Sequence, residues 1–318
     1  MDITSAAART RLREDWKIRM LKAFTEGAKS VSDLICQAES SNNAVNVYDL
    51  LIALPILKKF AGQIEKQNLQ RAQHRIENGE YQATISVRQA DIERDNIGQY
   101  NNKFDMLGIA ARRYPDRALG QLIADSFTVL DYTGTPFFAA DKPHIPGVIG
   151  AGAFTNLMTE KPSVASWEKA KKLMAYIMDA NGEPMGLGAE KTVVCSAKWS
   201  STFRRILNAE LIMQVAGANT AGAAVSNIFK GDATIVELPY LNSAAREDKW
   251  VVLDTSWPLR AYIHQTEVGP RMYAQDDPNT HKDAFEQHVF NYQVYLRGEL
   301  GFGLPQLAVG STGADAAL

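Results

Sequence analysis

Residues 84–127 read TISVRQADIERDNIGQYNNKFDMLGIAARRYPDRALGQLIADSF, and this stretch changes from the pattern of a strand to that of a long helix. Ile85 and Val87 alternate with polar neighbours, as in a half-buried strand. Beyond Asp91 or Asp95, either of which can cap a helix, apolar residues recur at steps of three or four. They predict one apolar stripe, made of Ile97, Tyr100, Phe104, Leu107, Ala111, Tyr114, Ala118 and Leu122.

The predicted helix has some thirty residues and a length of about 45 Å at ~1.5 Å per residue. Pro115 lies inside it and is expected to kink it or split it in two, because proline removes a hydrogen bond and clashes with the preceding turn. Such a helix can be a coiled-coil seam, a bundle member or a spine that carries two lobes. The stripe keeps no strict heptad, so a coiled coil is the weakest of these interpretations.

The composition is that of an ordinary globular protein. The 318 residues are 46% hydrophobic and 22% charged, enough for two domains or one elaborated domain. A net charge of −2 does not favour sequence-specific nucleic-acid binding. The longest apolar run, residues 50–57, is far shorter than the roughly 20 residues of a membrane span, and we expect no signal peptide. Cys36 and Cys195 lie far apart and indicate two buried thiols in a reducing compartment.

The N-terminal part predicts two segments that extend from the body of the protein. Residues 1–35 resemble a helical arm, and the polar stretch 65–80 contains Asn78-Gly79, a strong hairpin signal. We therefore expect a two-stranded hairpin over residues 58–92 with a polar tip, which is marginal alone and makes most sense on another subunit. The apolar residues of the arm are Leu12, Trp16, Met20 and Phe24.

The remainder predicts an α/β unit followed by returning strands. Residues 130–147 are rich in turn formers, with a domain boundary near 155–162. The α/β unit covers about residues 160–260: helices at 163–179, capped by Ser163 or Ser166, and at 197–213, and strands at 192–195, 233–238 and 249–254. The returning strands are expected at 259–264, 271–274 and 285–297, with Gly298, Gly301 and Gly303 as breaks before a last strand at 306–309.

No sequence motif predicts a catalytic, cofactor or metal site. There is no Walker-type loop, and the glycines at 150–152 and 301–303 lack the context of a dinucleotide site. Cys195 is expected to be a buried strand end without an activating base, and Ser311 is not in a nucleophile elbow. Asp276 and Asp277 together with Asp254 have the chemistry to bind a cation, but a solvated acidic turn is the favoured interpretation of these residues. The histidines have no metal-ligand spacing: His74, His144, His264, His281 and His288.

Five stretches in order resemble the Mu-like phage major head subunit gpT family of tailed-phage major capsid proteins. They are ATISVRQADIERDNIGQY (83–100), TGTPFFAADKPHIPG (133–147), NLMTEKPSVASWEKAKKLMAYIMDANGEPMGL (156–187), LPYLNSAAREDKWVVLDTS (238–256) and FNYQVYLRGELGFGLPQLAVGS (290–311). The resemblance covers nearly all of residues 45–311. It departs at Asp141-Lys142-Pro143, where the family pattern has a histidine before the proline; here the histidine is His144, which puts a role for that histidine in doubt.

The resemblance implies an α+β fold, the Hong Kong 97-type capsid fold. It implies an N-terminal arm at 1–50, an extended loop at 51–95, a peripheral domain with the spine helix at 96–160, an axial domain at 161–262, and peripheral return strands with the C-terminal tail at 263–318. The implied function is a major capsid protein that assembles into pentamers and hexamers of an icosahedral shell around double-stranded DNA, with no enzyme activity.

The implied partners are other copies of the chain, a scaffold protein, a portal, a decoration protein and packaged DNA contacted without sequence specificity. No cofactor, metal or membrane is expected, nor is a lysine–asparagine cross-link. The implied location is the virion, with assembly in the host bacterial cytoplasm. Two alternatives remain open: a soluble α/β enzyme with an unrecognised site, and a nanocompartment shell protein of the same fold.

Overall fold

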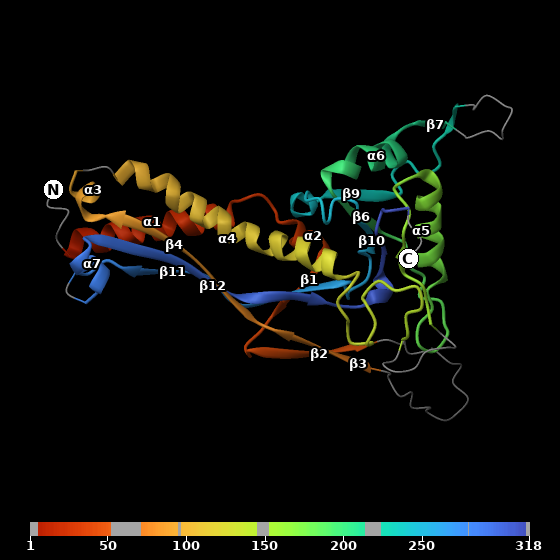
Figure 1. Ribbon diagram of the computed structural model, residues 1–318, viewed down its shortest axis with the longest axis horizontal. Coiled ribbons are helices and arrows are strands. Elements are labelled where there is room, and N and C mark those ends of the chain that lie inside the picture. The colour runs from red at the N-terminus through yellow and green to blue at the C-terminus, as the bar shows by residue number, and fades with distance from the viewer. Residues whose placement is uncertain are drawn as a thin grey trace, which may run out of the picture.

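The computed structural model describes residues 6–51, 71–94, 97–144, 153–213, 224–278 and 280–315. They form a long unit, in which two helices lie along a four-stranded sheet, and an α/β unit at one end of it (Figure 1). The longest helix, α4 (Ile97–Asp125), runs along the long unit and ends against the α/β unit. This arrangement agrees with the interpretation of the helix as a spine that connects two lobes.

The sheet of the long unit has the strand order β1-β11-β12-β4. Its strands are β1 (Cys36–Ser40), β4 (Gly79–Arg88), β11 (Tyr262–Gln275) and β12 (Val289–Phe302). In β4, Val87 pairs with Phe290 and Ile85 with Tyr292. Both pairs lie on the face toward the helices, which confirms the predicted alternation around Ile85 and Val87.

The N-terminal arm folds back onto its own chain. Helix α1 (Ala6–Thr25) lies beside α4, followed by the short helix α2 (Val31–Ile35). Trp16 and Met20 of α1 are fully buried in a cluster with Phe104, Leu107 and residues of β12. The predicted amphipathic pattern of the arm is therefore confirmed, and its apolar face packs within the same subunit.

The buried stripe of α4 changes position after Pro115. Tyr100, Phe104, Leu107 and Ala111 are buried as predicted, but beyond the proline the buried residues are Leu119 and Ile123, and the predicted Ala118 and Leu122 are only half-buried. The helix is continuous across Pro115, so the predicted split is wrong.

The shift follows a change of packing partner along α4. Its second half also contacts the 3₁₀ turn η1 (Pro239–Leu241), where Gly120 lies against Tyr240. Ahead of α4, Asp91 lies within the short helix α3 (Gln89–Glu93) and accepts a hydrogen bond from Tyr100. Asp95 and the side chain of Ile97 lie outside the described residues.

The predicted hairpin over residues 58–92 is corrected by the strand pairing. Strand β3 (Arg71–Glu77) pairs with β2 (Val45–Leu51), whereas β4 pairs with β12. Asn78-Gly79 is therefore the junction between two sheets and not a hairpin tip. The hairpin is formed by β2 and β3, which lie on the opposite side of the long sheet from α4 (Figure 1). Residues 52–70, which connect them, lie outside the described residues.

The α/β unit contains a five-stranded sheet with the order β5-β13-β10-β6-β9. The strands are β5 (Leu157–Met158), β6 (Lys191–Cys195), β9 (Ala233–Glu237), β10 (Trp250–Asp254) and β13 (Ala308–Ser311). Helix α5 (Val164–Tyr176) begins at the predicted cap Ser163, whose side chain accepts from the Ser166 backbone N–H. Helix α6 (Ala197–Asn208) is shorter than predicted, and β7 (Leu211–Met213) pairs with β8 (Ala224–Ser226) beyond it.

Of the three glycines predicted to break the returning strand, Gly298 and Gly301 lie within it, whereas the strand ends just before Gly303 as predicted. Strand β12 continues through Gly298 and Gly301 to Phe302. At both positions the absence of a side chain leaves room for a neighbouring atom. A Cβ at Gly298 would lie 2.4 Å from the Gln265 carbonyl oxygen, and one at Gly301 would lie 2.4 Å from Cδ1 of Ile76. Likewise, the strands predicted at 259–264 and 271–274 are one strand, β11, with irregular register between Thr266 and Arg271.

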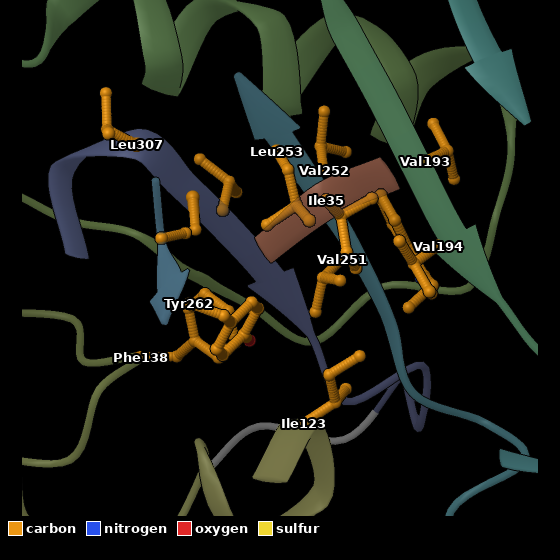
Figure 2. Close-up of a cluster of buried hydrophobic side chains, with 14 of the residues drawn as sticks. Ile35, Ile123, Phe138, Val193, Val194, Val251, Val252, Leu253, Tyr262 and Leu307 are labelled. Carbon is orange, nitrogen blue, oxygen red and sulfur yellow. The ribbon is translucent and has the colours of Figure 1, made fainter. Parts of the chain in front are cut away.

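The last strand also lies in a different sheet from the one expected. After the 3₁₀ turn η2 (Pro305–Leu307), β13 pairs with β10 and β5 of the α/β unit, although the sequence groups residues 263–318 with the returning strands. The two units consequently share one core. Figure 2 shows Ile35 of α2, Ile123 of α4 and Tyr262 of β11 beside valines of β6 and β10.

Candidate assembly surfaces

The cysteines are not arranged for catalysis. Cys195 is fully buried at the end of β6, and burial raises the pKa of its thiol to about 12. Burial also raises the pKa of Cys36, and the nearby Asp116 and Asp33 carboxylates add to this effect. Both thiols stay protonated at neutral pH, which is the state of structural cysteines.

The histidines lie on separate elements. His74 of β3 lies near the rings of Tyr132 and Phe302, with ring centroids 6.4 and 6.3 Å apart. Burial lowers the pKa of His74, an effect opposed by the Asp131 carboxylate, and burial likewise lowers the pKa of His264 on β11. His144 lies beside Gln306, whereas His281 and His288 flank the helix α7 (Lys282–Glu286). The lowered pKa values keep the half-buried His74 and His264 neutral at pH 7, which suits a role in packing.

The carboxylates proposed for a cation site serve separate structural roles. Asp254 accepts hydrogen bonds from Gly188 and Ser256 in the α/β unit. Asp276 and Asp277, at the end of β11, pair with Arg13 and Arg9 of α1. Within the described ranges, no three His, Cys, Asp or Glu side chains are grouped to hold a metal ion. Ser311 is buried and donates to the Glu160 carbonyl oxygen.

A cavity of about 630 Å³ lies between α4, strands β4 and β12 of the long sheet, and the loop that carries Arg246. Its two carboxylates are already engaged: Glu299 accepts from Tyr81, and Asp125 accepts from Gln121. The described residues that line it include no histidine, cysteine or serine. The described lining of the cavity therefore contains no nucleophile paired with a base, and it does not support the enzyme alternative.

The docking of the arm is the first feature relevant to assembly. The Trp16 ring stacks on Phe104 with centroids 4.4 Å apart and meets Tyr292 edge-on at 5.0 Å. Its indole N–H donates to Oδ1 of Asn101. Because Trp16 lies beside residues 101–104 and Met20 beside Gly108, α1 and α4 run in the same direction. Arg19 and Asp105 pair at 3.2 Å on the exposed side of this contact.

The base of the β2–β3 hairpin is fixed by a polar cluster around Asn78. The Tyr48 hydroxyl donates to Gln265 Oε1 at 2.6 Å, and the Gln265 amide donates to Asn78 Oδ1 at 2.6 Å. The amide group of Asn78 in turn donates to the Asn43 carbonyl oxygen at 2.8 Å and to Glu267. The hairpin is thus attached to the long sheet at its base, and its other described end is the pair Leu51 and Arg71.

A buried ion pair fixes the turn-rich segment between α4 and the α/β unit. The Lys142 ammonium lies 2.6 Å from Asp131 Oδ2, and both side chains are fully buried. Lys142 also donates to the Pro136 carbonyl oxygen at 2.8 Å, and Thr133 donates to Asp131. Burial lowers the pKa of Lys142, whereas the Asp131 carboxylate opposes that shift. The lysine that departs from the family pattern therefore has a structural role.

Large apolar side chains remain exposed on both units. They occur on the long unit at Ile18, Met106, Ile109, Tyr273 and Phe285, and on the α/β unit at Tyr176, Met178, Leu211 and Ile228. No helix in the part of the chain that the structure describes is long and apolar enough to cross a membrane.

Sequence reasoning missed two of these features. The Lys142–Asp131 pair has no local signal, since a lysine in a turn-rich segment is normally exposed. The second missed feature is the close contact of α1 at Gly108. It did have a signal, because glycine is unfavourable inside a helix and therefore indicates close packing.

Comparison with known proteins gives a consistent result. The model of the family described as "Mu-like prophage major head subunit gpT" matches residues 10–167 and 242–316, most of the chain. The major capsid protein of Escherichia phage Mu is 27% identical over 181 residues, which are 57% of each protein. The Mu-like prophage FluMu major head subunit of Haemophilus influenzae is 23% identical over 290 residues, covering 90% of this chain and 68% of that protein.

Solved structures show the same fold. A chain from the procapsid of bacteriophage JBD30 superposes with a TM-score of 0.57 at 22% identity, covering 96% of this chain and 75% of the other. A chain from the mature capsid of bacteriophage PhiM1 gives a TM-score of 0.53 at 13% identity, covering 89% of this chain and 87% of the other. These likenesses confirm the predicted phage-capsid fold and its α+β class.

Proposed function

Because this chain belongs to the Mu-like prophage major head subunit gpT family, we propose that it is a major head subunit that assembles into an icosahedral shell. The observation that carries the proposal is the position of the family match. It extends from α1 to the start of α5 and from before β10 to the last strand, so it includes both units. The family is one of structural head proteins and not of enzymes.

We further propose that pentamers and hexamers of this subunit close around double-stranded DNA. Shell interfaces of this kind are heterologous and close into rings. A subunit held by several neighbours needs only weak individual contacts, because the contacts act together. The net charge of −2 is compatible with a wall that encloses DNA without binding it tightly.

The proposed roles of the segments follow the domains implied by the family. Residues 1–50 are the arm, 51–95 the extended loop, 96–160 and 263–318 the peripheral domain, and 161–262 the axial domain. The pairing of β13 with β10 supports assigning residues 308–311 to the axial sheet. The hydrogen bonds at the base of the β2–β3 hairpin fix where the loop leaves the long sheet, which supports its proposed role as a loop that reaches a neighbouring subunit.

The proposed partners are further copies of the chain, a scaffold protein, a portal, a decoration protein and packaged DNA. The proposed location is the virion, after assembly in the host bacterial cytoplasm. The match spans 57% of the length of the Mu capsid protein, so these assignments for the whole protein are proposals.

Sedimentation velocity tests this function. The purified chain, alone and co-expressed with the phage's own scaffold gene, is expected to form particles that sediment far faster than any small oligomer. A dimer or tetramer that persists under both conditions would contradict the proposal and return weight to the enzyme alternative.

A further inference from the structure

Two apolar side chains on the long unit are largely exposed. Met106 on the outer face of α4 is 68% exposed, and Phe285 on α7 is 70% exposed. Helix α7 is attached to β12 by the buried Ala284 and lies at the end of the long unit that is farthest from the α/β unit (Figure 1). Both side chains would contribute more to stability in an interface than in water.

The face of α4 that carries Met106 is positively charged. Lys103 lies one turn before Met106, and Arg113 lies two turns beyond it; both are exposed. Arg113 makes no ion pair with any described residue, and Lys103 lies over the Tyr100 ring at 4.4 Å. The acidic residues of this part of α4 are already occupied: Asp105 pairs with Arg19, and Asp116 accepts from Ser30 and Ser32.

The surroundings of Phe285 have the opposite sign. Asp283 and Glu286 accompany one basic residue, Lys282, within the five residues of α7. Lys282 and Glu286 lie 3.7 Å apart on the exposed surface, where such a pair contributes little. Asp283 accepts a hydrogen bond from Asn291, which fixes its position at the base of the helix. Helix α7 thus presents one exposed aromatic ring among side chains whose net charge is negative.

We propose that α7 of one subunit binds the Met106 face of α4 on a second copy of this chain. Phe285 would pack on Met106, and Glu286 would face Lys103 or Arg113. The surfaces are complementary in both apolar character and charge, which gives an interface its orientation as well as its affinity. The two patches lie on different elements, so the contact is heterologous and can repeat from copy to copy. This inference rests on the proposed shell function.

A nucleic-acid partner fits the Met106 face less well. Lys103 and Arg113 alone would suit phosphate, but Met106 and Ile109 lie between them and are exposed, and phosphate contacts do not bury apolar side chains. An acidic protein other than this chain is the remaining competitor, and the experiment below distinguishes it.

Cysteine cross-linking tests the contact directly. The double variant Met106→Cys/Phe285→Cys is assembled under reducing conditions, oxidised and analysed by non-reducing electrophoresis. The native Cys36 and Cys195 are buried and do not compete. We expect a ladder of covalently linked subunits, because each copy has one cysteine of each kind. The control Met106→Cys/Ile228→Cys, with its second cysteine on the most exposed large apolar side chain among the described residues of the α/β unit, is expected to give no ladder.

The outcomes separate this inference from the proposed function. Closed shells without a ladder, or with equal ladders in both double variants, would overturn the α7–α4 contact and leave the shell function intact. A ladder without shells would support the contact and contradict the shell. Neither shells nor a ladder would contradict both.

Charge reversal provides a second test that does not depend on disulfide geometry. Lys103→Glu/Arg113→Glu and Glu286→Lys are each expected to reduce shell yield at least tenfold, and their combination is expected to restore a substantial part of it. If the α4 variant fails, Glu286→Lys assembles normally and the combination gives no rescue, the Met106 face binds a different protein and the inference is wrong.

Discussion

Gly108 of α4 lies directly against Met20 of α1: a Cβ built on Gly108 would be only 2.2 Å from the Met20 carbonyl oxygen. The two helices run in the same direction, and this close approach brings Trp16 onto Phe104. Any side chain at position 108 must therefore push the arm away from the spine helix. The contact between these two residues therefore sets how closely the arm packs on α4.

Replacing Gly108 by alanine is expected to loosen the arm. The added methyl group collides with backbone, which cannot rotate away as a side chain can, so the variant should lose about 1–3 kcal/mol of stability despite the better helix propensity of alanine. Limited trypsin digestion should cut α1 faster than in the unchanged protein. The control is Gly98→Ala on the same helix, where no atom lies within 4 Å and a gain of about 0.5–1 kcal/mol is expected. Equal behaviour of both variants would contradict the packing.

Charge placed on the buried stripe of α4 is expected to unfold the long unit. Leu107 is 5% exposed, so Leu107→Asp should cost roughly 3–5 kcal/mol in the free energy of unfolding, measured by urea denaturation of the dissociated subunit. Its neighbour Met106 is exposed, and Met106→Asp should change that free energy by about 0.5 kcal/mol or less. A Leu107→Asp protein that stays soluble with unchanged stability would show that the helix face is misassigned.

The ion pair between Lys142 and Asp131 is expected to act as a unit. Lys142→Met leaves a buried carboxylate without its cation and should cost about 3–5 kcal/mol. The double variant Lys142→Met/Asp131→Asn removes both charges and should be destabilised by less than the sum of the single variants, with a coupling of about 0.5–3 kcal/mol. If the losses of unfolding free energy in the two single variants, measured by urea denaturation, add up to that of the double variant, the two residues do not stabilise the protein as a pair.

Acid is expected to destabilise the subunit through His74 and His264. Burial lowers the pKa of both groups in the folded protein, so the unfolded chain takes up protons first as the pH falls below about 6.5. Their contribution to stability is complete above that pH and is lost as the pH falls through the folded-state pKa values. The variant His74→Gln/His264→Gln should show a smaller loss of unfolding free energy between pH 7.5 and 5.5. An unchanged loss would assign the acid sensitivity to other groups.

The extended loop is expected to be dispensable for folding and required for assembly. Because Leu51 pairs with Arg71, residues 52–70 can be replaced by a four-residue glycine–serine turn that leaves β2 and β3 intact. Removal of residues 66–80, the deletion suggested by the sequence alone, would destroy β3. The shortened protein should keep its circular dichroism spectrum and melting temperature but form no shells in light scattering. Normal shells from this variant would exclude a role for the loop between subunits.

The fold was predictable where local pattern determines packing. The alternation at Ile85 and Val87, the arm residues Trp16 and Met20, and the Ser163 cap all follow from period and capping chemistry, and the structure confirms them. The family resemblance rested on stretches in order, and the family match confirms it.

The errors occur where a distant partner decides the outcome. Asn78-Gly79 is a hairpin signal locally, but Gln265 and Glu267 engage the Asn78 side chain from another strand. From the sequence alone, Gly298 and Gly301 look like strand breaks. The structure shows that they accommodate Gln265 and Ile76, which lie too close for a side chain at either position. No local rule predicts such contacts, since Ile76 and Gly301, for example, are 225 positions apart in the sequence (301 − 76).

The central claim is that this chain builds a closed shell, and electron microscopy of the purified protein tests it most directly. The account predicts closed particles of uniform size with five-fold and six-fold clusters of subunits, from the chain alone or with its scaffold. A homogeneous small oligomer under both conditions, with no rings, tubes or shells, would contradict it.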